Sequence, residues 1–146
     1  MREGRAPAGT AFIAVLALAA CAGAPRQGSA PTTAPVVVDA STAERAVTLR
    51  PGQVLVVRLR SNPSTGYRWG IAQGATTVLA PAGPPGFEAD ANAEGRLGAG
   101  GVETFRFTAV ATGREALRFA YRRPWEKDAA PASTAVVDVD VRAGGS

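Results

Sequence analysis

Hydrophobic and polar residues alternate along four segments of this chain, and a period of two is typical of strands with one buried face. The segments are residues 54–60, 103–109, 115–121 and 136–141. The side chains predicted to face the core are Leu55, Val57, Leu59, Phe105, Phe107, Ala109, Leu117, Phe119, Tyr121, Val137, Val139 and Val141. On the opposite, wet faces we place Glu103, Thr104, Arg106, Thr108, Arg118, Asp138 and Asp140. The pattern therefore predicts strands that cover a common core.

Turn-forming residues separate these segments, and residues 41–146 keep no apolar period of 3.6 residues for three helical turns. Many short strands in about 100 residues favour an all-β fold, an antiparallel β-sandwich of about seven to eight strands. A small, partly open barrel is the structural alternative. Residues 76–96 are predicted to form a long connection with one short strand around Val78, and Val36–Val38 is a candidate edge strand.

The first 20 residues have the pattern of a secretory signal peptide, with a basic start and an apolar run from Ala11 to Ala20. That run is about half of the roughly 20 apolar residues that cross a bilayer, so it predicts export and not a membrane span. Leu18-Ala19-Ala20-Cys21 resembles the lipobox of bacterial lipoproteins, in which the cysteine becomes the lipid-bearing first residue. An ordinary signal peptide with a chance cysteine is the alternative.

Residues 21–40 are accordingly predicted to be a lipidated cysteine with a flexible linker, and residues 41–146 the folded domain. The linker is rich in proline, alanine, glycine and threonine, which suits a semi-extended tether. Two or more acyl chains hold a protein stably on a membrane. We therefore expect a location in the cell envelope, lipid-anchored to a bacterial membrane with the domain in the periplasm or at the cell surface.

The composition narrows the classes of function. Histidine, the most frequent general base near neutral pH and the commonest metal ligand, is absent from the sequence. Cys21 is the one cysteine, and its assignment to the lipid leaves no disulfide and no catalytic thiol. Loss of the signal peptide removes two basic residues and one acidic residue, which lowers the formal charge from +4 to +3. Because the other arginines are scattered, we expect no nucleic-acid partner, and we also expect no metal and no cofactor.

The stretch Asn62–Gly66 is an unusually constrained connection between two predicted strands. Pro63 fixes its own φ and biases Asn62 toward an extended backbone, while Gly66 adopts positive φ without steric cost. The Asn62 side chain is expected to bond to the backbone two residues on, which holds Ser64 and Thr65 at the tip. A loop with few accessible states loses little entropy when it docks. A tight turn that only joins strands is the alternative.

Two further loops suit an interaction surface. Gly98–Gly101 leaves the backbone bare, so that it approaches another surface closely, although a flexible hairpin turn is the alternative. Arg123–Trp125 carries two residue types that often dominate binding energy at interfaces. The alternative for Trp125 is burial in the core, where we place Trp69. Turns separated by an even number of alternating strands emerge at one end of a sandwich, so the three loops are predicted to form a wedge.

Together the three stretches resemble the chagasin family of cysteine-peptidase inhibitors. The family pattern is an Asn-Pro-Thr-Thr-Gly-aromatic loop, a Gly-x-Gly-Gly loop and an Arg-Pro-Trp/Phe loop on an immunoglobulin-like sandwich. In this chain the corresponding residues are Asn62-Pro63-Ser64-Thr65-Gly66-Tyr67, Gly98-Ala99-Gly100-Gly101 and Arg123-Pro124-Trp125. The resemblance covers about residues 46–142, and Ser64 in place of the first threonine is the departure from the pattern.

The resemblance implies a monomeric inhibitor, not an enzyme, that binds papain-like cysteine peptidases reversibly and tightly. It also implies that the first loop sits over the catalytic cysteine and histidine while the other two loops grip the sides of the cleft. A lipid-anchored, immunoglobulin-like binding module with a different surface partner is the alternative function. An enzyme that uses Asp138 and Asp140 is a distant third, because nothing places a second catalytic group opposite them.

Overall fold

The computed structural model describes residues 34–41, 44–75, 77–91 and 98–144. The predicted signal peptide, Cys21 and the linker up to residue 33 lie outside the described residues. These described residues form one compact unit. Among the described residues, no helix is long and apolar enough to span a bilayer.

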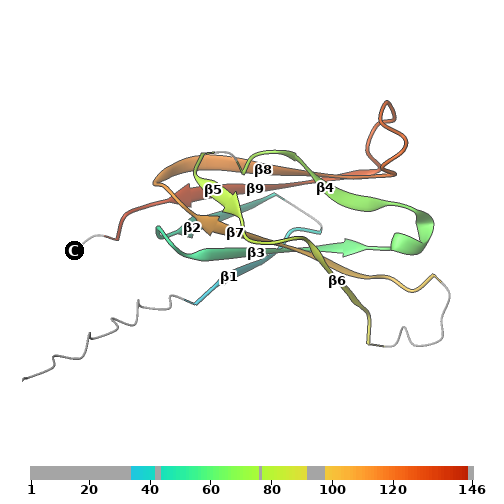
Figure 1. Cartoon of the computed structure of the whole chain (residues 1–146), viewed down its shortest axis with the longest axis horizontal. Coiled ribbons are helices and arrows are strands. Elements are labelled where there is room, and N and C mark those ends of the chain that lie inside the picture. The colour runs from blue at the N-terminus through green and yellow to red at the C-terminus, as the bar shows by residue number, and fades with distance from the viewer. Residues whose placement is uncertain (1–33, 42–43, 76, 92–97, 145–146) are drawn as a thin grey trace, which may run out of the picture. The chain divides into compact units, whose positions relative to one another are not determined.

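The described part of the chain forms two sheets that face each other (Figure 1). The first sheet contains β1 (Val36–Asp39), β3 (Val54–Ser61), β5 (Leu79–Pro81), β6 (Gly86–Ala89) and β7 (Gly101–Ala109), with β5 and β6 both paired to β7. The second sheet contains β2 (Arg45–Leu49), β4 (Arg68–Gln73), β8 (Gly113–Arg122) and β9 (Ser133–Val141) in the order β2-β9-β8-β4. The predicted β-sandwich is therefore confirmed.

The strand count and two pairings differ from the expectation. The described residues form nine strands where about seven to eight were predicted, because the segment expected to be a connection near Val78 contributes both β5 and β6. The pairs β3–β7, β8–β9 and β4–β8 are antiparallel, but β1 pairs with β3 and β2 pairs with β9 in parallel. The candidate edge strand at Val36–Val38 is confirmed as β1, so the folded domain includes part of the segment assigned to the linker.

The core lies between the two sheets and is built from the alternating positions of the sequence. Leu55, Val57 and Leu59 of β3 are fully buried against the valines of β9 and the aromatic residues of β7 and β8. The ring of Phe119 lies 5.0 Å from that of Phe105 and 6.3 Å from that of Phe107, centroid to centroid. Phe119 thus joins the two sheets at the centre of the core.

Two positions depart from the predicted faces. Glu103 was placed on the wet face of its strand, but the structure buries its side chain on the core side together with Phe105. Tyr121 was assigned to the core and is only half-buried. Both residues lie at the end of the sandwich where the loops described below leave the sheets.

We expect Phe119→Ala to lower the free energy of unfolding by about 3–5 kcal/mol, because it empties the space between two other rings. The measurement is the midpoint of urea unfolding, with the slope of the transition checked for change. Phe87→Ala is the matched control, since Phe87 is a half-exposed phenylalanine of β6. Equal losses for the two variants would contradict the central role given to Phe119.

Candidate functional site

The three loops singled out in the sequence lie at one end of the sandwich, on the right of Figure 1. Strand register explains this position. Ser61 at the end of β3 pairs with Gly101 at the start of β7, so the first and second loops leave neighbouring strands side by side. Arg68 at the start of β4 pairs with Arg122 at the end of β8, which places the third loop beside the first. The first loop passes from one sheet to the other and lies between the other two.

The first loop folds into one 3₁₀ turn, η1 (Pro63–Thr65), closed by Gly66 with a φ of +80°. The backbone N–H of Thr65 donates to the carbonyl of Asn62 at 3.2 Å, and that of Gly66 donates to the carbonyl of Pro63 at 2.9 Å. The Thr65 hydroxyl donates to the Asn62 carbonyl at 2.6 Å. The turn is therefore held by bonds within itself, while Ser64 and Thr65 stay exposed at its tip.

Asn62 connects the first loop to the second. Its Oδ1 accepts a hydrogen bond from the Ser64 hydroxyl at 2.6 Å, and its Nδ2 donates to the carbonyl of Gly98 at 3.0 Å. The sequence predicted a bond from this side chain to the backbone two residues on; the bond is instead made to the side chain of that residue. Gly98 has a φ of +85°, which a glycine adopts without strain and which aims its carbonyl at Asn62.

Arg123 connects the third loop to the first. Its Nε donates to the carbonyl of Thr65 at 3.4 Å, and its guanidinium lies 4.8 Å from the centre of the Tyr67 ring. Glu126 holds the same guanidinium from the other side, with 3.2 Å between Oε1 and Nη1. An arginine over an aromatic face is attracted by the ring quadrupole, so this contact adds to the hydrogen bond.

The side chain of Trp125, from the third loop, packs against the first loop and is 67% exposed. A methyl group added at Gly66 would lie 2.7 Å from Cη2 of this tryptophan, so the indole covers the glycine closely. Trp125 is thus outside the core, as the interaction hypothesis expected, yet it is positioned by a neighbouring loop. Trp69 has the opposite placement, and its predicted burial is confirmed at 8% exposure.

Beneath the loops, aromatic side chains with polar groups fix the ends of the first loop. The Tyr121 hydroxyl accepts from the backbone N–H of Asn62 at 2.9 Å and lies 3.4 Å from its carbonyl. Trp69 donates its indole N–H to the carbonyl of Arg60 at 2.7 Å. The Tyr121 ring lies 5.1 Å from that of Trp69 and 5.4 Å from that of Tyr67. These contacts tie both stems of the loop to β8.

Glu103 is the residue of this site that sequence reasoning missed. Its carboxylate is 5% exposed and accepts hydrogen bonds from the Ser61 hydroxyl and, at 3.3 Å, from the backbone N–H of Trp69. A buried carboxylate costs free energy unless it is hydrogen-bonded, and here the bonds join β7 to both stems of the first loop. The alternation of the strand could have revealed it, because Glu103 is two residues from Phe105 and therefore lies on the same, buried face of β7.

A bidentate ion pair supports the stem of the second loop. Arg60 donates to the two carboxylate oxygens of Asp90 at 2.7 and 2.9 Å, and the Asp90 backbone N–H donates to the carbonyl of Gly100 at 3.1 Å. The hydrogen bond from Arg60 is the main cause that holds the pKa of Asp90 below its usual value of 3.8. Gly101, which ends this loop, lies against the β6 backbone, where an added methyl group would be 2.3 Å from the carbonyl oxygen of Glu88.

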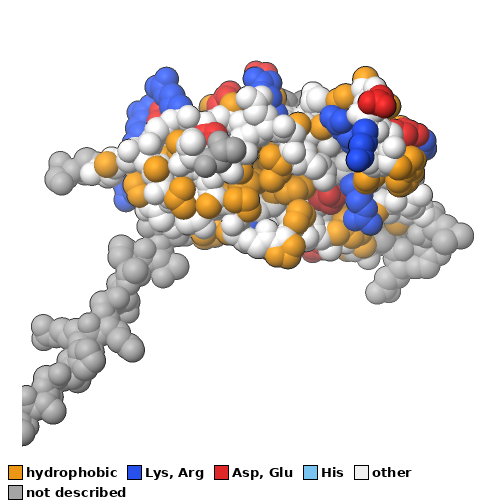
Figure 2. Space-filling view, turned by 45° about the horizontal axis from the view of Figure 1, so that its top comes forward, with side chains coloured by type: hydrophobic (Ala, Val, Ile, Leu, Met, Phe, Trp, Pro, Cys, Tyr) orange, Lys and Arg blue, Asp and Glu red, His pale blue; other side chains and the backbone are white. Residues whose placement is uncertain are grey.

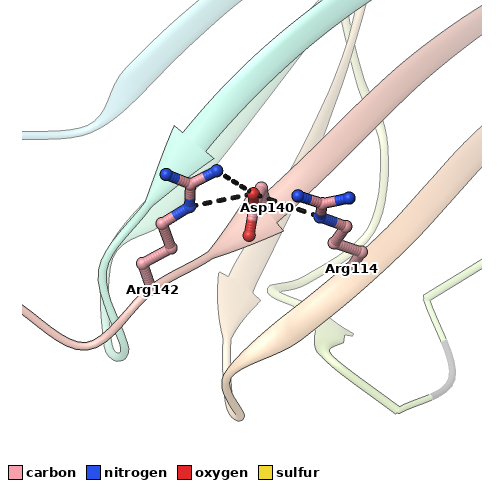
Figure 3. A network of polar contacts seen from close by, with 3 residues as sticks. All are labelled: Arg114, Asp140 and Arg142. Atoms are coloured by element: carbon pink, nitrogen blue, oxygen red, sulfur yellow. Dashed lines mark hydrogen bonds and ion pairs between the residues drawn. The ribbon is translucent and has the colours of Figure 1, made fainter.

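The acidic pair considered for catalysis lies in a different environment. Figure 3 shows Asp140 between Arg142 and Arg114, whose Nε atoms lie 2.9 and 3.3 Å from Oδ2. The hydrogen bond from Arg142 is the first cause of a lowered pKa at Asp140. The carboxylate is therefore an ionised partner of two arginines. Among the described residues, no group of three acidic, cysteine or histidine side chains is placed to hold a metal ion.

We expect Gly66→Ala to displace Trp125, because the added methyl group would overlap the indole. Gly52→Ala is the matched control: its φ is +81°, and a methyl group there would meet no atom within 4 Å. In both variants the free energy of unfolding should fall by about 1–2 kcal/mol, because alanine is strained in a left-handed backbone. Only Gly66→Ala should also shift the Trp125 indole N–H signal in NMR spectra. An unmoved signal would show that the close contact does not position this side chain.

We expect the Arg60–Asp90 pair to break as the pH falls through the lowered pKa of Asp90. The folded-state pKa lies below the unfolded value, so the stabilisation is present above pH 3.8 and is lost during acidification. NMR titration of the Asp90 carboxyl should give a higher pKa in Arg60→Gln than in the parent. Arg58→Gln, on the same strand face, is the control and should leave this titration unchanged. Identical titrations in all three proteins would refute the ion pair.

Comparisons with known proteins match most of the folded domain, from within β2 to within β9. Residues 48–139 match the model of the chagasin family of peptidase inhibitors. Chagasin of Trypanosoma cruzi is 32% identical over 83 residues, which cover 54% of this chain and 73% of chagasin. Amoebiasin-1 of Entamoeba histolytica is 31% identical over 85 residues, which cover 57% of this chain and 78% of that relative.

Solved structures show the same immunoglobulin-like β-sandwich. The crystal structure of the cysteine protease inhibitor EhICP2 from Entamoeba histolytica matches with a TM-score of 0.64 at 22% identity, covering 73% of this chain and 95% of that one. PbICP-C, solved in complex with falcipain-2, matches with a TM-score of 0.51 at 17% identity, covering 73% and 99%. Since the family model spans well over half of the sequence, the chain belongs to the chagasin family of cysteine-peptidase inhibitors, which are not enzymes.

Proposed function

We propose that this protein inhibits papain-like cysteine peptidases reversibly and tightly, by inserting its three loops as a wedge into the active-site cleft. The observation that carries the proposal is the direct bonding between the loops. Asn62 bonds to Gly98 of the second loop, and Arg123 of the third loop bonds to Thr65. Loops joined in this way dock as one preformed surface, so little conformational entropy is lost on binding.

The shape of the first loop explains how such a wedge escapes cleavage. A peptidase cleaves a peptide whose carbonyl is held in line with the attacking thiolate. In η1 the carbonyls of Asn62 and Pro63 already accept hydrogen bonds from within the loop, and the backbone is turned, not extended. The tip therefore fills the cleft without presenting a peptide bond in the geometry of attack.

The flanking loops supply the grip. Trp125 presents a large exposed indole on a fixed support, and tryptophan is among the residues that most often dominate interface energy. The Gly98–Gly101 stretch offers bare backbone to the other side of the cleft. The relative PbICP-C has been solved in complex with falcipain-2, which supports a papain-like partner for this chain.

We further propose that the inhibitor acts as a monomer, exported and held at the cell envelope by a lipid on Cys21. The support is the sequence pattern of residues 1–21, a signal peptide that ends in a lipobox. An anchor of this kind would keep the inhibitor where foreign or secreted peptidases arrive. Mass spectrometry of the mature N-terminus tests it, and an unmodified cysteine would refute the lipid.

The inhibitor assignment is tested by titrating papain with the purified chain and measuring residual peptidase activity. We expect stoichiometric loss of activity that returns on dilution. Trp125→Ala should raise the inhibition constant about 30-fold, because an interface anchor contributes about 2 kcal/mol or more. Val110→Ala, which shortens an exposed side chain far from the loops, should change nothing. Absence of inhibition by the parent at micromolar concentration would favour a binding module with another partner.

A further inference from the structure

A groove of about 420 Å³ runs along the outer face of β4 and β8, next to the third loop. Its floor is made of small residues, Gly70, Ala72 and Ala120, and a methyl group added at Gly70 would meet no atom within 4 Å. Arg68 and Arg122 border it at the end near the loops. The groove is thus open to solvent, has a floor of short side chains and is flanked by positive charge.

The two arginines are an unusual pair. Arg68 and Arg122 occupy directly opposite positions of the β4–β8 ladder, where like charges destabilise a sheet. Neither forms an ion pair or a side-chain hydrogen bond with another described residue, whereas Arg60, Arg114, Arg123 and Arg142 all have carboxylate partners. Arg118 lies further along β8 and is also exposed without a described partner. The residues that line the groove include no Asp or Glu, so Arg68 and Arg122 face it without the carboxylate partner that those four arginines have.

The groove continues the surface of the three loops. Arg68 follows Tyr67 of the first loop, Arg122 precedes Arg123 of the third, and Pro124 lines the groove itself. Figure 2 shows basic side chains next to hydrophobic ones at the end of the molecule that carries the loops. A peptidase seated on the loops would therefore lie beside the groove.

We propose that this groove is a second contact for the target peptidase and receives an acidic segment, with exposed Asp or Glu side chains, on the rim of the peptidase cleft. The inference rests on the proposed inhibitory function and adds a determinant of specificity to it. Arginine pairs with carboxylates in a bidentate geometry, and the small floor lets the acidic segment approach. Unpaired positive charge also accelerates association with a negative surface.

The test measures association and dissociation rates of the full chain with papain and with falcipain-2 at low and physiological ionic strength. We expect Arg68→Gln combined with Arg122→Gln to slow association with at least one peptidase about tenfold at 10 mM salt, and by less than about twofold at 150 mM, where charges are screened. Gly70→Leu fills the groove without changing charge, and it should raise the dissociation rate of the same complex about threefold or more.

Arg114→Gln combined with Arg142→Gln is the matched control, with the same change of charge on the same sheet. These two arginines lie roughly 25 Å from the loop end, at the start of β8 and just after β9. The control should associate like the parent. If it slows association equally, or if no variant differs from the parent with either peptidase, the groove is not a peptidase contact and the inference is wrong.

The outcomes also separate this inference from the function on which it rests. Failure of the parent to inhibit any peptidase would remove the proposed function itself, whereas normal inhibition with unchanged rates would remove only the groove. Sedimentation with vesicles of phosphatidylglycerol and phosphatidylcholine tests the other source of negative charge. Binding by the parent that Arg68→Gln and Arg122→Gln abolish, without an effect on peptidase rates, would assign the groove to a lipid surface instead.

Discussion

The register of two strand pairs is the constraint on which the rest of the structure depends. Pairing of Ser61 with Gly101 and of Arg68 with Arg122 brings the ends of four strands from both sheets to one edge. A shift of one residue in either pair would turn the core side chains of the shifted strand outward. The hydrophobic core therefore determines which loops meet, and the loops need no long-range attraction of their own to find one another.

Rigidity at the loop end comes from a polar layer placed where the core ends. The side chains of Glu103, Tyr121 and Trp69 each form hydrogen bonds to the stems of the first loop. Buried polar groups that are fully bonded specify one geometry, because every alternative leaves a donor or acceptor unpaired. Among the described residues, no buried side-chain polar atom lacks a partner. A small domain can thus present an exposed tryptophan and a turned backbone in a fixed arrangement.

Sequence alternation was sufficient to predict the sandwich and most of its core, since a period-two pattern indicates directly which side chains are buried. The burial of Trp69 was predicted from its position just after the first loop. It did not predict the parallel pairing of β1 and β2, because an edge strand has similar residues in either direction. It also placed Glu103 in water, since a carboxylate is ordinarily exposed and its partners, Ser61 and Trp69, are distant in sequence. The Asn62–Gly98 bond could not be predicted for the same reason. It depends on the register between β3 and β7, two strands that are distant in sequence.

The parallel pairing of β1 with β3 also decides where the polypeptide enters the domain. β1 advances in the same direction as β3, toward the loops, so Val36 lies at the opposite pole, next to Leu55. β9 ends near that pole too, where the Arg142 N–H donates to the Leu49 carbonyl. A pull on the N-terminal side would load the β1–β3 ladder in shear, with its bonds sharing the force. A bead or sensor attached at Val36 or Val141 would sit at the pole away from the three loops and leave the loops unobstructed.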